Sequence, residues 1–197
     1  MKELPLASIV LALVTMFCSM AVAFIISGSI IGNVTMIDLD VYGGVTVSRL
    51  SNWEVWRLFT CQLVHAKQYH MFYNVLSIVV LGLFMERRIG WTLFLLVWFV
   101  AGASGTLYST LFVSAPWDTG TGASQGVLGL AGFGIVLTVL TQNNRGLVYA
   151  LLFALIPAFL LDLIFAHYPK PGHVLGLTLG MVMGVFSVGK LKVTTSN

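Results

Sequence analysis

Long apolar runs with few charges dominate this chain of 197 residues. Hydrophobic residues make up 58% of the sequence and charged residues 9%, whereas soluble domains contain roughly 25% charged residues. A helix needs about 20 apolar residues to cross a bilayer, and backbone groups in lipid must satisfy their hydrogen bonds within the span. We therefore expect an all-α membrane protein with six transmembrane helices, forming one domain over residues 1–197. The predicted spans cover about residues 6–27, 70–86, 91–113, 124–141, 147–166 and 172–189.

The basic residues indicate how such a bundle is oriented. Cytoplasmic loops of membrane proteins carry an excess of lysine and arginine. This rule places both termini in the cytoplasm, which we interpret as the inner side of a bacterial cytoplasmic membrane. With six spans, one side of the membrane carries Lys2, Arg87, Arg88, Arg145, Lys190 and Lys192.

The connection between the first two spans, residues 28–69, has an amphipathic part. Apolar and charged residues alternate in it at near-helical spacing, and tryptophans favour the membrane interface. We expect one or two short helices there, in a loop half-embedded in the outer interface. The apolar positions are Val47, Leu50, Trp53, Trp56, Phe59 and Leu63.

Polar residues open three apolar runs at one side of the membrane. His70 and Asn74 begin the second span, Ser124 begins the fourth and His173 begins the sixth. These spans all run inward from the outer side, so the four residues lie at similar depth. Polar groups in a membrane usually face the bundle interior or a water-filled cavity. The pattern predicts one wet pocket near the outer leaflet.

Glycine spacing indicates which spans touch. Small residues at intervals of three or four let membrane helices approach backbone to backbone. If spans four and six approach in this way, the Ser124 hydroxyl reaches the His173 imidazole, as in the nucleophile–base pair of acyl transfer. The free amides and dipole at the start of span four suit an oxyanion. The glycines are Gly126, Gly129 and Gly132 in span four and Gly176, Gly180 and Gly184 in span six.

Each polar residue also has a structural interpretation. Ser124 in a glycine-rich helix is ordinarily packing, His173 could be a structural histidine, and His70 with Asn74 could form an interhelical hydrogen bond. A metal site from His65, His70 and His173 lacks neighbouring cysteines or carboxylates. One active site explains all these positions together, which favours chemistry over packing.

Two further patterns bear on Ser124 and His173. Asp162, eleven residues before His173, could orient that histidine as a third triad member or cap the outer end of the fifth span. Gly122-x-Ser124-x-Gly126 matches the nucleophile elbow of α/β-hydrolases, but that motif follows a strand in a soluble sheet. We interpret the match as accidental.

Taken in order, five motifs resemble those of the rhomboid family of intramembrane serine proteases, over about residues 53–189. The resemblance implies a six-helix rhomboid-like bundle. The motifs are Trp56-Arg57, His65-x4-His70-x3-Asn74, Glu86-Arg87-Arg88-x-Gly90, Gly122-x-Ser124 with Gly129 and Gly132, and His173-x2-Gly176-x3-Gly180.

The resemblance assigns roles to the matching residues. Ser124 would be the nucleophile and His173 the general base and acid, a dyad in which Asp162 has no assigned part. The Ser124 amide would help to hold the oxyanion. Gln125 stands where the family usually has glycine, and Leu128 where an aromatic ring often stacks on the base histidine. The oxyanion and substrate-binding residues would be His70, Asn74, Ala123 and Gln125.

The implied partners are single-span membrane proteins, cleaved near the outer leaflet, and the surrounding lipid bilayer. No metal or cofactor is implied. The net charge of +3 is too small and dispersed to indicate nucleic-acid binding. The alternatives are a non-catalytic relative that binds transmembrane helices and a specialised enzyme for C-terminal sorting tails. A small transporter is disfavoured because the sequence has no inverted repeat.

Overall fold

Helices account for the regular secondary structure of the described chain. The computed structural model describes residues 4–114, 118–141 and 145–194. For Thr141 and residues 188–194 it describes the backbone alone. Lys2 lies outside the described residues, as do the side chains of Lys190 and Lys192. The predicted all-helical class is confirmed. The long helices are α1 (Leu6–Ser27), α5 (Gln68–Ile89), α6 (Trp91–Phe112), α7 (Ser124–Thr141), α8 (Arg145–Phe165) and α9 (Pro171–Thr194).

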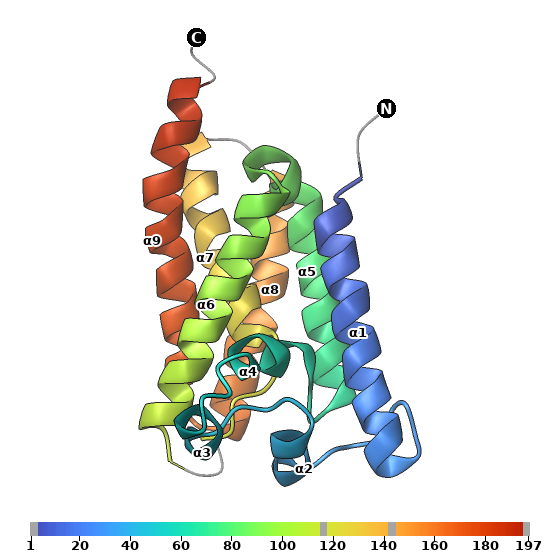
Figure 1. Cartoon of the computed structure of the whole chain (residues 1–197). Coiled ribbons are helices and arrows are strands. Elements are labelled where there is room, and N and C mark those ends of the chain that lie inside the picture. The colour runs from blue at the N-terminus through green and yellow to red at the C-terminus, as the bar shows by residue number, and fades with distance from the viewer. Residues whose placement is uncertain (1–3, 115–117, 142–144, 195–197) are drawn as a thin grey trace.

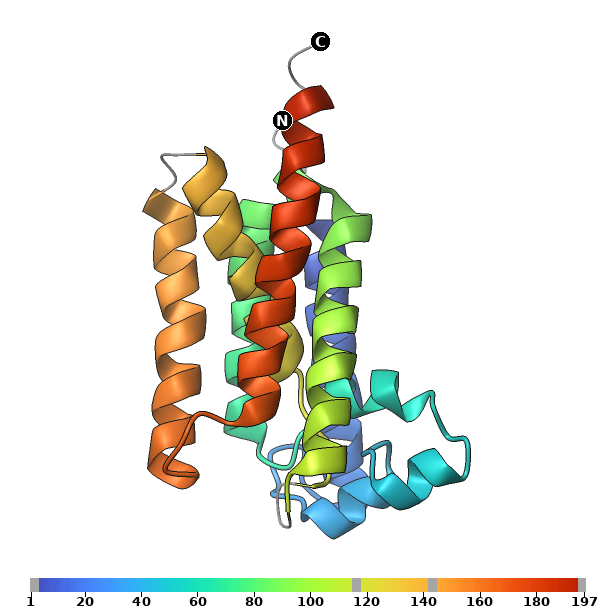
Figure 2. The same ribbon diagram turned by 90° about the vertical axis from the view of Figure 1, so that its left-hand side faces the viewer.

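The long helices stand side by side, as Figures 1 and 2 show. The start of α1 and the end of α9 lie at the upper end of the bundle in Figure 1, on opposite sides of it, and the short helices lie at the lower end. The short elements are α2 (Met36–Val41), α3 (Val47–Ser51), α4 (Arg57–Thr60) and the 3-10 helix η1 (Cys61–Leu63).

Helix α7 occupies the middle of the bundle. Residues 122–134 are all buried, and the helix packs mainly against α9 and α6. A helix in the interior of a bundle is apolar on every side. This position explains why the sequence of α7 has no polar face. The start of α7, where Ser124 lies, is therefore positioned by neighbours on every side.

Glycines allow α7 and α9 to approach backbone to backbone. A Cβ at Gly176 would collide with the carbonyl oxygen of Gln125, and one at Gly180 would collide with that of Gly129. A Cβ at Gly132 would meet the carbonyl oxygen of Leu177. The predicted close contact between these two helices is present, and it sets the separation of Ser124 and His173.

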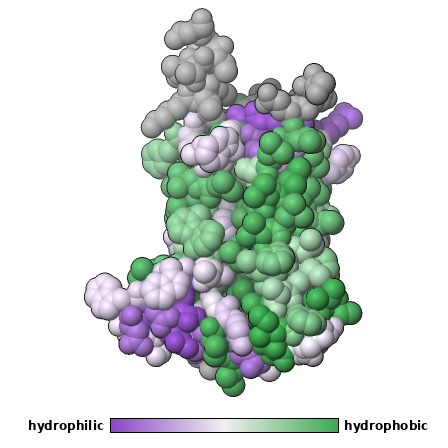
Figure 3. Space-filling view, turned by 45° about the vertical axis from the view of Figure 1, so that its right-hand side comes forward, coloured by the Kyte–Doolittle hydropathy of each residue, from purple (hydrophilic) through white to green (hydrophobic). Residues whose placement is uncertain are grey.

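The exterior of the bundle is apolar. By length and composition, α1, α5, α6 and α8 are long and apolar enough to cross a membrane, and the described apolar parts of α7 and α9 are shorter. Figure 3 shows hydrophobic side chains covering the middle of one face, with hydrophilic ones toward both ends. Large exposed side chains such as Phe17, Ile156 and Phe186 contribute to the apolar exterior of the bundle.

Ion pairs and carbonyl contacts hold the connection between α1 and α5. Asp40 and Glu54 both pair with Arg49, and Glu54 also pairs with Arg57 at 2.6 Å. The Arg57 guanidinium is buried and donates to two backbone carbonyl oxygens, those of Asp40 and Gly44, at 2.7 Å each. Trp53 remains 82% exposed. The position of this loop relative to a membrane stays a prediction.

A carboxylate fastens α1 to α5 at the end of the bundle where α1 begins. The Glu86 side chain is buried near the end of α5 and accepts hydrogen bonds from the amides of Ala7 and Ser8, at 2.9 and 2.8 Å. These amides belong to the first turn of α1, which has no internal acceptors for them and attracts negative charge. Glu86 thus replaces a local cap, which Pro5 does not supply.

Replacing Glu86 by alanine should destabilise the bundle. Two charge-assisted hydrogen bonds are lost and two amides are left without partners, so we expect the free energy of unfolding to fall by about 1.5–3 kcal/mol. Unfolding of the purified protein in detergent measures the change. Arg88→Ala, which removes an exposed charge two residues away, is the control, and equal losses in both variants would contradict the capping role.

Candidate active site

The connection before α7 fixes the position of Ser124. Gly122 has a φ of +92°, a left-handed conformation that favours glycine. Its amide donates to the carbonyl oxygen of Cys61 at 2.8 Å, and the Ala123 amide donates to Nε2 of His65 at 3.1 Å. The helix then begins at Ser124 itself. The serine hydroxyl therefore lies beside the unpaired first-turn amides of α7.

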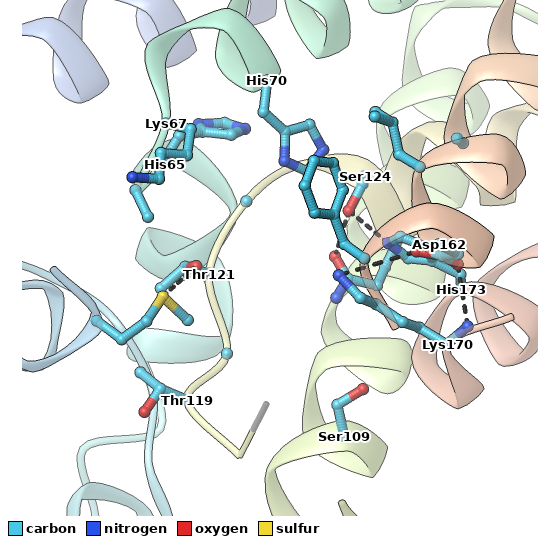
Figure 4. Close-up of a pocket in the computed structure, with 18 of the residues that line it drawn as sticks. His65, Lys67, His70, Ser109, Thr119, Thr121, Ser124, Asp162, Lys170 and His173 are labelled. Carbon is cyan, nitrogen blue, oxygen red and sulfur yellow. Dashed lines mark hydrogen bonds and ion pairs between the residues drawn. The ribbon is translucent and has the colours of Figure 1, made fainter. Parts of the chain in front are cut away.

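Ser124 and His173 are in hydrogen-bond contact. The distance from Ser124 Oγ to His173 Nε2 is 2.8 Å, and both side chains are buried. His173 lies in the first turn of α9, three residues before the glycine that touches the carbonyl oxygen of Gln125. The close helix contact thus carries the imidazole to the serine. Figure 4 shows the two side chains pointing toward each other.

Asp162 lies on the other side of the same imidazole. Its Oδ2 atom is 2.7 Å from His173 Nδ1 and accepts the backbone amide of Lys170 at 2.9 Å. The Lys170 ammonium lies 3.8 Å from Oδ1. The sequence alone is compatible with Asp162 either as a helix cap or as a triad member. The usable signal was a carboxylate at the outer end of an apolar run, the level predicted for His173.

The other predicted site residues divide into two groups. His70 and Gln125 line the same cavity as Ser124 and His173, and Gln125 Oε1 lies 3.2 Å from the Ser124 hydroxyl. Asn74 and Ala123 are fully buried and lie outside the cavity lining. The Asn74 side chain points its amide nitrogen toward His65 Nε2, at 3.1 Å, instead of toward the serine.

His65 is the residue whose role the sequence did not reveal. Its Nε2 atom faces two donors, the Ala123 amide and the Asn74 side-chain amide. A backbone amide can only donate, so Nε2 is unprotonated and the proton resides on Nδ1. Burial, with a smaller contribution from nearby His70, lowers the pKa of His65 well below its ordinary 6.5. The neutral ring therefore holds the segment leading into Ser124.

The cavity beside Ser124 has a volume of about 570 Å³. Its lining combines apolar side chains such as Leu161 and Phe165 with the polar groups of the site and two lysines, Lys67 and Lys170. Such a mixture of apolar surface and a few convergent polar groups is typical of ligand sites. Within the described ranges, no three side chains of histidine, cysteine, aspartate or glutamate converge as a metal site.

Comparison with known proteins gives one consistent result. The family profile of the Rhomboid domain matches residues 52–190. RHOMBOID-like protein 1 of Arabidopsis thaliana is 32% identical over 157 residues, which cover 75% of this chain and 39% of that protein. Rhomboid-like protease 3 of Toxoplasma gondii is 34% identical over 98 residues, 50% of this chain and 35% of the relative.

A relative named as inactive also matches. Inactive RHOMBOID-like protein 8 of Arabidopsis thaliana is 31% identical over 106 residues, 53% of this chain and 29% of its own length. The chain therefore spans less than half the length of each of these three relatives.

The pH dependence of stability should reveal the neutral state of His65. In the unfolded chain this histidine titrates near 6.5, whereas in the folded chain its pKa is lower. Below about pH 6.5 the unfolded state binds the extra proton, so stability falls as pH falls. The contribution is about 1.4 kcal/mol per pH unit until the folded-state pKa is reached.

Unfolding in detergent between pH 7 and 5 measures this slope. His65→Gln should make it shallower, and His167→Gln, which replaces an exposed histidine, is the matched control. An identical slope in the wild-type protein and His65→Gln would assign the pH dependence to other groups.

Proposed function

The chain belongs to the rhomboid family, and from that premise we propose that it is an intramembrane serine endopeptidase with Ser124 as nucleophile and His173 as general base. It is an integral, multi-pass membrane protein. The observation that carries the proposal is the 2.8 Å contact between Ser124 Oγ and His173 Nε2 at the edge of the cavity. A hydroxyl beside a buried base is the arrangement that activates a serine for acyl transfer.

Peptide hydrolysis would proceed in two halves. Ser124 Oγ bonds to the scissile carbonyl carbon while its proton passes to His173 Nε2. The oxyanion collapses, the carbon–nitrogen bond breaks, and Nε2 gives that proton to the leaving amine. Water then attacks the acyl-serine and delivers a proton to Nε2, and the second collapse returns a proton to Ser124. The dyad is restored and both new chain ends are released.

The oxyanion would be held by donors around the start of α7. The first-turn amides of α7 and the imidazole of His70, which lines the cavity, are the available groups. Pre-oriented donors of this kind commonly supply the largest share of transition-state stabilisation. In our proposal Ala123 and Asn74 do not contact the oxyanion. Both donate to His65, which holds the segment before Ser124. Gln125 presents its amide oxygen to the Ser124 hydroxyl at 3.2 Å, so in this arrangement it accepts from the serine.

The membrane arrangement follows from the same bundle. All six long helices would span the bilayer, and the connection containing Trp53 and Trp56 would rest in the outer interface, where exposed tryptophans are favoured. Arg87 and Arg88 lie in the last turn of α5, and α8 begins at Arg145. The positive-inside rule places their side in the cytoplasm. The active site would then face the outer leaflet of a membrane that we propose to be a bacterial inner membrane.

The proposed substrates are single-span membrane proteins. An extended segment of the substrate chain must reach Ser124 through the cavity, whose wall includes apolar residues of α8 such as Leu161 and Phe165. The alternative, a non-catalytic rhomboid protein that binds transmembrane helices, is kept because one relative is named as inactive. Retention of both Ser124 and His173 in contact favours the enzyme.

Loss of either residue should abolish turnover. We expect Ser124→Ala and His173→Ala to lower cleavage of a fluorogenic single-span substrate in proteoliposomes by at least about a thousandfold. Ser124→Ala should also abolish labelling by a fluorophosphonate. Ser51→Ala, which removes an exposed hydroxyl of α3, should retain both activities. Cleavage that survives Ser124→Ala would exclude this nucleophile, and a wild-type protein that neither cleaves nor labels would favour the non-catalytic alternative.

A further inference from the structure

We propose that Asp162 is a positioning residue that converts the Ser124–His173 pair into a Ser–His–Asp triad. The inference rests on the proposed function and names a third member of the same site. Its basis is the 2.7 Å distance between Asp162 Oδ2 and His173 Nδ1, the ring nitrogen that does not face Ser124. The three side chains come from three helices, α8, α9 and α7.

The hydrogen bonds around Asp162 define the tautomer of His173. Oδ2 accepts the Lys170 backbone amide, which is always a donor. An oxygen that already accepts this bond is best satisfied by a second donor, so the imidazole proton resides on Nδ1. The Nε2 lone pair then faces the Ser124 hydroxyl. Without the carboxylate, either ring nitrogen could carry the proton, and the wrong choice would block proton transfer from serine.

The surroundings hold the carboxylate in one orientation. The Asp162 side chain is 2% exposed and the His173 side chain 5%, so water does not compete for their contact. The Lys170 amide fixes one oxygen, and its ammonium lies beside the other and offsets the buried charge. Buried charges require such partners. The connection from α8 to α9 thus brings Lys170 and His173 back to the carboxylate of α8.

This geometry has a direct consequence for the proton transfer. When His173 Nε2 takes the Ser124 proton, the ring becomes a cation, and the adjacent carboxylate stabilises that charge while Nδ1 keeps its own proton. The proton is later passed from Nε2 to the leaving amine, and Asp162 is never protonated. A residue that served only as a helix cap would have no contact with Nδ1 and no effect on this step.

Kinetics of Asp162→Asn test the positioning role. Asparagine has nearly the same shape but can donate to Nδ1, which forces the proton onto Nε2. We expect kcat and the rate of fluorophosphonate labelling to fall by about a hundredfold to ten-thousandfold, with KM changed by less than about threefold. Asp162→Glu, which retains a carboxylate, should have a kcat at least about tenfold higher than that of Asp162→Asn. Glu86→Gln neutralises a buried carboxylate at the opposite end of the bundle and should keep the wild-type kcat.

The tautomer gives a second readout that does not require turnover. Nitrogen-15 NMR of histidine-labelled protein, at about pH 9 and with His173 assigned by its loss in His173→Ala, should show the proton on Nδ1 in the wild type. It should move to Nε2 in Asp162→Asn. This measurement applies even to a protein without measurable cleavage, and the wild-type half of it applies even if Asp162→Asn does not fold.

The outcomes distinguish a failure of the triad proposal from a failure of the proposed protease function. If the wild type cleaves and depends on Ser124, but Asp162→Asn keeps kcat within about threefold, the dyad stands and the triad is overturned. A wild-type His173 protonated on Nε2 overturns the triad as well. If the wild type neither cleaves nor labels while Nδ1 carries the proton, the proposed function fails and the Asp162–His173 contact remains.

Discussion

The contact between α7 and α9 is the constraint on which the candidate site depends. Gly176 lies against the carbonyl oxygen of Gln125, so the two helices meet one residue after Ser124 and three residues after His173. Hydrophobic burial supplies little attraction between helices in lipid, and close packing of small residues replaces it. Any side chain at Gly176 would push the imidazole away from the hydroxyl. The glycine spacing therefore determines the geometry of the candidate site as well as the packing of the two helices.

Much of this arrangement could be read from the sequence, because helix length, polarity and glycine spacing are local properties. The all-helical class and the meeting of Ser124 with His173 follow from them. The roles of His65 and Asn74 could not be predicted in this way. They depend on how η1 and the residues after it fold back against Gly122 and Ala123, and helical periodicity contains no information about that path. Sharing a helix face with His70 therefore did not direct the Asn74 amide to the serine.

The role of Asp162 also depends on a loop path that the sequence pattern does not reveal. A carboxylate near a helix end is compatible with a cap or with a triad, and the choice depends on the turn through residues 166–170 that brings Lys170 and His173 back to it. The family resemblance placed Leu128 where an aromatic ring often steadies the base histidine. Leu128 is instead fully buried in the core, and the carboxylate contact to Nδ1 offers His173 a different means of orientation.

Charged and hydrogen-bonded side chains connect separate segments at both ends of this apolar bundle. Glu86 fastens α1 to α5 at one end, while Arg57, His65 and Asp162 fasten loops to helices at the other. Because unpaired polar groups in a low-dielectric interior are costly, each bond defines a single geometry where apolar packing would tolerate several. The end with more of these bonds is the one that contains Ser124. The need to satisfy buried polar groups thus accounts for the orientation of the His173 imidazole between Asp162 and Ser124.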